Sequence, residues 1–265
     1  MQLLNNPIKL GGEERVATIL FSDIRGFTTF CEGLPPKEVL KALNIVLSTI
    51  SDIVESHQGV VDKYNGDAVM ALFGVPIKGT TYTANGMSAL LEVTAALEKM
   101  DSGLSACVGI TTGIVVAGNL GSSNRMNYSV IGDTVNLSAR RESLTRLYNA
   151  SNIVSEASRD DAPNFACREL GIVCAAGKSQ SVRIFELLGI EDELSNSKKS
   201  EVAAFSEALK EYREQNWDVA EQLFSCLQIK CDNAQLYQVF LDRIENFRKN
   251  SPEPNWQGEY VFSSK

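Results

Sequence analysis

The chain has 265 residues, of which 44% are hydrophobic and 22% are charged, so it can bury an ordinary globular core. Its net charge of −8 argues against nucleic acid as a partner, because no basic surface is available to release counterions from phosphates. Six cysteines without CxxC spacing and a single histidine argue against a zinc site and fit a cytoplasmic chain with reduced thiols. No apolar run reaches the length of a membrane span, although the chain can be the cytoplasmic part of a longer protein with an upstream membrane or sensor domain.

The first hundred residues predict a strand, a helix, a hairpin and a second helix. A continuous apolar run indicates a buried strand over 15–24, and apolar residues at helical spacing indicate a helix over 35–59. Asn65-Gly66 between two apolar runs predicts a hairpin over 60–74 with these two residues as its loop. Another helix is expected over 79–100.

The next ninety residues predict mainly strands. Residues 105–121 suggest two strands bent around Gly113, and 127–133 lead into a helix over 134–150. Short strands are expected at three further places: 151–155, 165–173 and 181–189. This order predicts an α+β domain in which helices pack on one mostly antiparallel sheet.

The remainder of the chain predicts a linker followed by helices. The polar segment 190–201 is expected to be the linker, and helical stretches follow in 202–229 and 232–250. The first stretch resembles a single tetratricopeptide-type helix pair, with the residues Ala208, Tyr212, Trp217, Ala220 and Phe224. One such unit cannot form a solenoid, so we expect it to pack on the main domain or on a partner.

Two carboxylates mark the first candidate site. Asp23 ends a buried strand and Asp67 follows the hairpin tip. A carboxylate in such a place is costly unless it is paired or metal-bound, and two of them suit a hard cation such as Mg²⁺. The backbone amides of Ile24 to Thr28, among them those of Gly26, Phe27 and Thr28, can cradle a polyphosphate substrate.

A second candidate group lies further along the chain. Asn136 and Arg140 are four residues apart on a predicted helix and therefore share a face, where an amide and a guanidinium suit phosphoryl chemistry. Lys178, in a loop between strands, can bind a phosphate. The alternative is structural, because Arg140 can instead form a surface ion pair with Glu142 or Asp133.

The hairpin also carries an expectation about faces. With the two-residue loop given above, Tyr64 pairs with Asp67 and Lys63 pairs with Ala68. Because cross-strand partners share a face, Lys63 and Asp67 should point to opposite faces. If both bind one nucleotide, two chains must share each site.

Five segments in register carry a family resemblance: FSDIRGFT, VVDKYNGDAVMALFG, GITTGIVVAGNLG, YSVIGDTVNLSAR and GKSQSVRIFEL. In this order they resemble a class III nucleotidyl cyclase catalytic domain of the bacterial adenylyl type. The resemblance implies a ferredoxin-like (βαββαβ) fold, and a homodimer whose composite sites each hold two Mg²⁺ or Mn²⁺ ions. It divides the chain into an N-terminal coupling segment (1–14), a catalytic domain (15–190) and a linker with a small helical extension (191–265).

The resemblance also implies a role for each residue at the base and the metals. Asp23, Asp67 and the carbonyl of Ile24 would bind the two metal ions. From the other chain, Lys63 would recognise the adenine edge and Ser129 would contact the exocyclic amine. Guanylyl members have Glu and Cys at the positions of Lys63 and Ser129, so ATP is the expected substrate.

The remaining implied roles concern the ribose and the phosphates. Asn136 would hold the ribose, Arg140 would stabilise charge at the α-phosphate, and Lys178 would bind the terminal phosphates. The expected activity is conversion of ATP to cyclic AMP and pyrophosphate in signal transduction. The alternatives are a guanylate cyclase and a silent nucleotide-binding module. Three residues depart from the family pattern: Ser129, where many adenylyl members have Asp or Thr, Arg141 in place of an apolar residue and Ala176 in place of a lysine.

Overall fold

The computed structural model describes residues 11–100, 104–122, 125–175, 181–253 and 255–262. The chain forms two compact units, Met1–Glu142 and Ser143–Lys265. The boundary between them falls inside one helix, α4 (Asp133–Tyr148). Among the described helices, none combines the length and the apolar character that a membrane span requires.

The first unit is built on an antiparallel sheet. Its strands are β1 (Gly11–Arg25), β2 (Val60–Asn65), β3 (Ala68–Phe73), β4 (Ser105–Ser122) and β5 (Arg125–Ile131). Its helices are α1 (Phe27–Glu32), α2 (Pro36–Ser56), α3 (Tyr82–Glu98) and the first part of α4. The strand order is β2-β3-β1-β4, with β5 paired to β4. With α2 and α3 as the crossovers, this order confirms the expected ferredoxin-like α+β arrangement.

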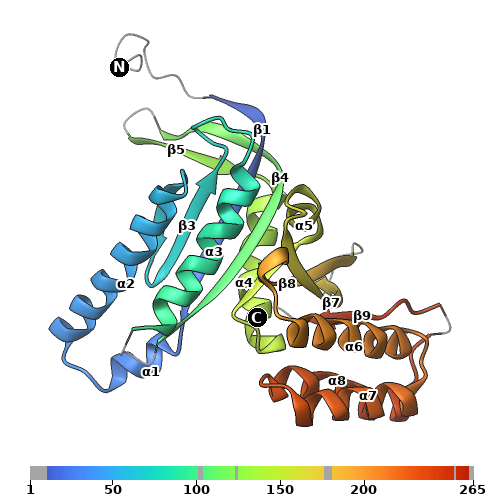
Figure 1. Cartoon of the computed structure of the whole chain (residues 1–265). Coiled ribbons are helices and arrows are strands. Elements are labelled where there is room, and N and C mark those ends of the chain that lie inside the picture. The colour runs from blue at the N-terminus through green and yellow to red at the C-terminus, as the bar shows by residue number, and fades with distance from the viewer. Residues whose placement is uncertain (1–10, 101–103, 123–124, 176–180, 254, 263–265) are drawn as a thin grey trace. The chain divides into compact units, whose positions relative to one another are not determined.

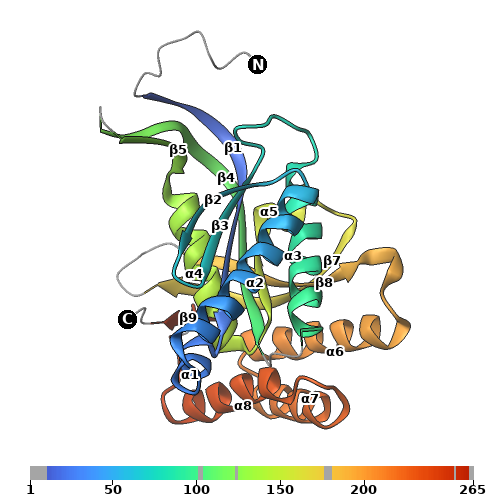
Figure 2. The same ribbon diagram turned by 90° about the vertical axis from the view of Figure 1, so that its left-hand side faces the viewer.

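Helices α2 and α3 lie together over one face of this sheet (Figures 1 and 2). On that face, the hydroxyl of Thr18 in β1 hydrogen-bonds Thr83 of α3 at 3.0 Å and Thr112 of β4 at 2.8 Å. The opposite face carries an apolar cluster: Ala17, Ile19, Met70, Leu72, Val75, Val115, Ala117 and Val130, with Phe21 and Val135 packed against it. Burial of both faces explains why the strands read as nearly continuous apolar runs.

The expected bend at Gly113 is wrong, because β4 is one continuous strand. A Cβ on Gly113 would lie 2.8 Å from the side-chain oxygen of Thr134 in α4. The glycine therefore allows the helix to approach the strand closely and does not break the strand. Strand β1 also begins earlier than expected, with Gly11 paired to Asn119 of β4.

The hairpin register differs from the sequence prediction. Asn65 pairs with Ala68, so the two-residue loop is Gly66-Asp67 and not Asn65-Gly66. Gly66 takes the positive φ of 66° in that loop. Lys63 therefore pairs with Met70 and not with Ala68, and a β-bulge between Val61 and Lys63 shifts the register once more. The cross-strand pairing from which we expected Lys63 and Asp67 to face opposite ways is therefore absent.

The second unit joins short strands to three long helices. Its strands are β6 (Asn152–Ser155), β7 (Phe165–Ala175), β8 (Ser181–Ile190) and β9 (Glu259–Phe262), in the order β6-β8-β7-β9. Its helices are α5 (Glu156–Asp161), the short η1 (Glu191–Glu193), α6 (Asn196–Arg213), α7 (Trp217–Lys230) and α8 (Ala234–Lys249). Helix α5 and strand β9, which runs parallel to β7, were not predicted from the sequence.

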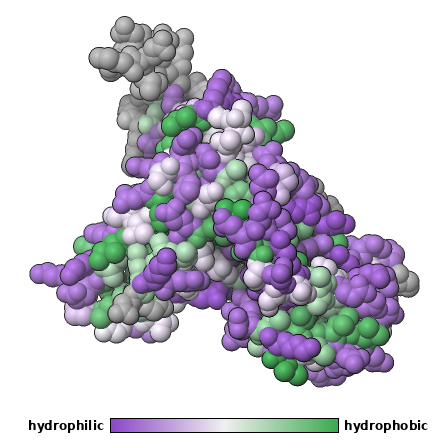
Figure 3. Space-filling model, in the orientation of Figure 1, coloured by the Kyte–Doolittle hydropathy of each residue, from purple (hydrophilic) through white to green (hydrophobic). Residues whose placement is uncertain are grey.

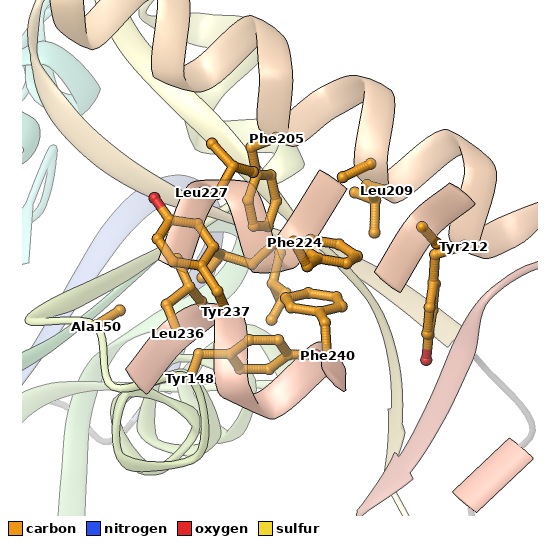
Figure 4. Packing of buried hydrophobic residues seen from close by; sticks show 14 of the residues in the cluster. Tyr148, Ala150, Phe205, Leu209, Tyr212, Phe224, Leu227, Leu236, Tyr237 and Phe240 are labelled. Atoms are coloured by element: carbon orange, nitrogen blue, oxygen red, sulfur yellow. The ribbon is translucent and has the colours of Figure 1, made fainter. Parts of the chain in front are cut away.

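The expected linker over 190–201 is largely helical, because α6 begins at Asn196. Ser195 caps this helix by accepting a hydrogen bond from the amide of Lys198 at 3.2 Å. The three long helices share one apolar core with the end of α4 and with strands of this unit, and Figure 4 shows their stacked and edge-on rings. Phe224 and Phe240 stack at its centre, with ring centroids 4.7 Å apart.

A buried arginine connects these helices to the strands of the same unit. Arg168 of β7 is 1% exposed and pairs with Glu186 of β8 and Glu201 of α6. Tyr237 of α8 donates a hydrogen bond to the same Glu201 at 2.8 Å. In Figure 3, green apolar residues gather over the C-terminal helices. Ile229 of α7 is 85% exposed.

Candidate active site

Two carboxylates meet where β1 ends beside the β2–β3 hairpin. Asp23 lies near the end of β1, and Asp67 occupies the second position of the hairpin loop. Burial, followed by a hydrogen bond to Asp23 and the charge of that residue, raises the pKa of Asp67 above 3.8. The structure thus brings together the two carboxylates that the sequence singled out.

The donor set at this point fits a divalent cation. Two adjacent carboxylates repel each other, and a bound cation removes this repulsion because it neutralises both. Mg²⁺ takes one or two carboxylates and leaves its other positions to water and substrate phosphates. Among the described residues, no group of three or more His, Cys, Asp or Glu side chains is suited to a metal. The carbonyl of Ile24 follows Asp23 directly, and the amide of Ile24 donates to the Asp23 carboxylate at 2.9 Å.

The predicted phosphate-binding residues come immediately after this pair. Gly26 has a φ of 77° and precedes α1, which begins at Phe27. A positive φ favours glycine here because it has no Cβ. The first amides of a helix, here those of Phe27 and Thr28, have no partner within the helix.

Helix α4 is held unusually close to β4, and this contact positions the second pair of predicted residues. A Cβ on Gly109 of β4 would lie 2.5 Å from both the amide nitrogen of Glu142 and the carbonyl oxygen of Ser138. The Ser138 hydroxyl lies 2.8 Å from the carbonyl oxygen of Ile19 and 3.0 Å from that of Gly109, and its one proton can be donated to either. The helix backbone is therefore fixed directly against the sheet.

Asn136 and Arg140 lie on the face of α4 that turns away from this contact. Each is two residues from Ser138, which places both on the opposite side of a helix with 3.6 residues per turn. Asn136 is exposed and Arg140 is half-buried. No ion pair joins Arg140 to another of the described residues, so the structural alternative of a pair with Glu142 or Asp133 finds no support.

Arg141, which departs from the family pattern, turns into the protein. It is 5% exposed and donates to the hydroxyl of Thr111 in β4 at 2.7 Å. Burial lowers the pKa of Arg141 to about 10. The side chain thus adds a polar tie between α4 and β4, next to the exposed face that carries Arg140.

Lys63 and Ser129, which are 66 positions apart in the sequence, contact one carboxylate. The Ser129 hydroxyl donates to Oδ2 of Asp62 at 2.9 Å, and Nζ of Lys63 lies 3.2 Å from the same oxygen. The Asp62 side chain is 2% exposed, whereas that of Lys63 is 57% exposed. The structure therefore gathers the two residues expected at the base.

Asp62 belongs to this site although the sequence did not predict it. It precedes Lys63 in β2, and neighbours in a regular strand point to opposite faces. The bulge brings the Asp62 carboxylate to Lys63, and no local sequence pattern predicts that bulge. Lys178 lies outside the described residues, so its predicted phosphate contact stays a prediction.

Comparison with known proteins gives the same assignment as these residues. The family model for the adenylate and guanylate cyclase catalytic domain matches residues 12–186. Adenylate cyclase 1 of Rhizobium meliloti (strain 1021) is 32% identical over 182 residues, which cover 65% of this chain and 27% of that protein. Adenylate cyclase of Anabaena cylindrica is 34% identical over 192 residues, which cover 65% of this chain and 37% of that protein. The chain thus spans about a third of the length of the curated relatives it matches.

Solved structures agree with the fold. The adenylyl cyclase CyaB from P. aeruginosa superposes with a TM-score of 0.63 and 28% identity, over 70% of this chain and 100% of that chain. The guanylyl cyclase Cya2 superposes with a TM-score of 0.58 and 34% identity, over 70% of this chain and 98% of that chain. With its carboxylate pair, its α4 residues and this match over most of its length, the chain belongs to the family of adenylate and guanylate cyclase catalytic domains.

Proposed function

We propose that this chain is an adenylate cyclase, which converts ATP to 3′,5′-cyclic AMP and pyrophosphate for signalling. The observation that supports ATP as the substrate is that Lys63 and Ser129 both contact the carboxylate of Asp62. An ammonium donates to N1 of adenine but opposes the N1–H of guanine. A serine oxygen can accept from the amino group of adenine, where guanine presents a carbonyl.

Asp23, the carbonyl of Ile24 and Asp67 would hold two Mg²⁺ or Mn²⁺ ions. When bound, these ions would acidify the 3′-hydroxyl of ATP and neutralise phosphate charge. The raised pKa of Asp67 supports this assignment, because the carboxylate pair gains most from a bound cation.

In the proposed reaction the 3′-hydroxyl attacks the α-phosphate in line and pyrophosphate leaves. Arg140, on the outer face of α4, would offset the charge that develops at the α-phosphate. Asn136, one turn earlier on the same face, would hold the ribose and align the hydroxyl. Gly26, Phe27 and Thr28 would border the triphosphate, with Lys178 at its far end.

The active species is proposed to be a homodimer with sites shared between two chains. Val16 of β1 and Ile114 of β4 are cross-strand partners, and both are exposed, at 48% and 64%. Ile131 of β5 is exposed as well, at 53%. Apolar residues exposed together are typical of surfaces that bind another protein. An upstream membrane or sensor domain could act on such a dimer through the N-terminal coupling segment.

The test is turnover of ATP and of GTP by the purified chain with Mn²⁺ over a range of protein concentrations. Cyclic AMP whose specific activity rises with concentration is expected from a dimer with shared sites. Cyclic GTP as the main product would favour the guanylate cyclase alternative, for which the likeness to Cya2 gives some support. Binding of nucleotide without any cyclic product would indicate a silent binding module.

A further inference from the structure

Asp62 occupies a place in the site that the family assignment does not explain. It is the extra residue of the β2 bulge, between Val61, which pairs with Ala71, and Lys63, which pairs with Met70. A bulge redirects a side chain that a regular strand would send to the other face. Here the bulge turns the Asp62 carboxylate inward, and the Asp62 side chain is only 2% exposed.

A buried carboxylate needs hydrogen-bond partners, and those of Asp62 are the two residues proposed to read the base. Its Oδ2 atom lies 2.9 Å from the hydroxyl of Ser129 and 3.2 Å from the ammonium of Lys63. The carboxylate accepts and does not donate, so Ser129 must supply its only proton to this bond. Lys63 uses one of its three donors there and keeps the other two.

This bond settles the hydrogen-bonding sense of the serine. A free hydroxyl rotates and can either donate or accept, so it would suit the amino group of adenine and the carbonyl of guanine alike. With its proton committed to Asp62, the oxygen of Ser129 can only accept. Such an acceptor can receive a hydrogen bond from the amino group of adenine, whereas O6 of guanine is itself an acceptor and repels it.

We propose that Asp62 is a specificity-determining residue, which holds Ser129 as an obligate acceptor and Lys63 beside it so that ATP is preferred over GTP. This inference rests on the proposed function. Asp62 acts through its two neighbours and is a positioning residue, not a catalytic one. Its removal should therefore change the choice of nucleotide more than the rate of the reaction.

The experiment compares the ratio of kcat/KM for ATP to that for GTP in the full chain and in Asp62→Ala, Ser129→Ala and the double variant. Each single variant should lower the ratio about tenfold, the usual order for one discriminating base contact. The double variant should be no less selective than Ser129→Ala, because the two residues act as one unit. Asp52→Ala, which removes an exposed carboxylate of α2, is the matched control and should leave the ratio unchanged.

A merely structural role for Asp62 would lower turnover of both nucleotides equally and leave the ratio intact, which would overturn the proposal. If Asp62→Ala does not fold, Asp62→Leu keeps the approximate size of the side chain and removes both oxygens that can accept from Ser129. That variant should also lose selectivity, and an unchanged ratio would again count against the inference.

A competition measurement separates this inference from the proposed function. ATP and GTP compete for the parent chain and for Asp62→Ala in the presence of Ca²⁺, with bound nucleotide as the readout. A parent chain that makes no cyclic product refutes the cyclase assignment, yet its ATP preference in binding still tests Asp62. A parent chain that binds neither nucleotide overturns both.

Discussion

Gly109→Ala tests whether the close contact between β4 and α4 sets the catalytic geometry. The added Cβ would lie 2.5 Å from two backbone atoms of α4, the nitrogen of Glu142 and the oxygen of Ser138. Ordinary contacts of this kind begin at 3.4 Å, so α4 must withdraw by about 0.9 Å. Backbone atoms of a helix cannot rotate away, so the helix has to shift as a unit.

The shift should reduce activity strongly and stability moderately. Arg140 and Asn136 move with α4, and a displacement of about 1 Å can reduce the rate of a positioned reaction by about 100-fold. Overpacking at one site costs about 1–3 kcal/mol of unfolding free energy. We therefore expect kcat for cyclic AMP formation to fall by about 100-fold while the variant remains folded.

The assay is steady-state turnover with Mn²⁺ and ATP, beside urea unfolding of the same samples. Gly79→Ala is the control, because nothing lies within 4 Å of its added Cβ. Gly113→Ala should show a smaller loss, since the nearest atom, at 2.8 Å, belongs to the Thr134 side chain, which can move. Full activity in a folded Gly109→Ala variant would refute the link between this contact and the position of Arg140.

Three further predictions concern the carboxylate pair and the second unit. Asp67→Asn should reduce Mn²⁺-dependent turnover at least 100-fold while the protein stays folded, as circular dichroism would check; near-normal turnover would exclude Asp67 as a metal ligand. Because the pKa of Asp67 is raised above 3.8, the native state holds this proton to higher pH than the unfolded chain does. The stabilisation from this proton is complete below pH 3.8 and disappears as pH rises through the raised pKa of Asp67. Mn²⁺ affinity, measured calorimetrically, should weaken as pH falls through the same pKa. Asp23→Asn should move that weakening to lower pH. Arg168→Ala leaves the buried Glu186 without its cation and Glu201 with Lys198 alone, and should cost about 3–5 kcal/mol in urea unfolding; a cost below about 1 kcal/mol would show that the network contributes little.

Local patterns were sufficient to predict most elements and most of the candidate site. Apolar spacing predicted α2 and α3 because one face of each helix is buried, and continuous apolar runs predicted β1 and β3 because both faces of the sheet are covered. The carboxylates at Asp23 and Asp67 were recognisable because charges at the ends of buried strands need a partner. Asn136 and Arg140 could be paired because helical spacing alone places them on one face.

Contacts between segments decided what the sequence by itself could not. The loop at Gly66-Asp67 and the bulge at Asp62 depend on which hydrogen bonds the two strands make together, and a slip of one residue reverses every face. Gly113 suggested a bend because glycine permits one, whereas its neighbour in space, Thr134, shows that it leaves room for a helix. The sequence by itself therefore determined the order of the elements and the chemistry of the site residues, which follow from local periodicity and residue type. Only the tertiary structure decided which of those residues meet, because register and close packing are properties of two segments at once.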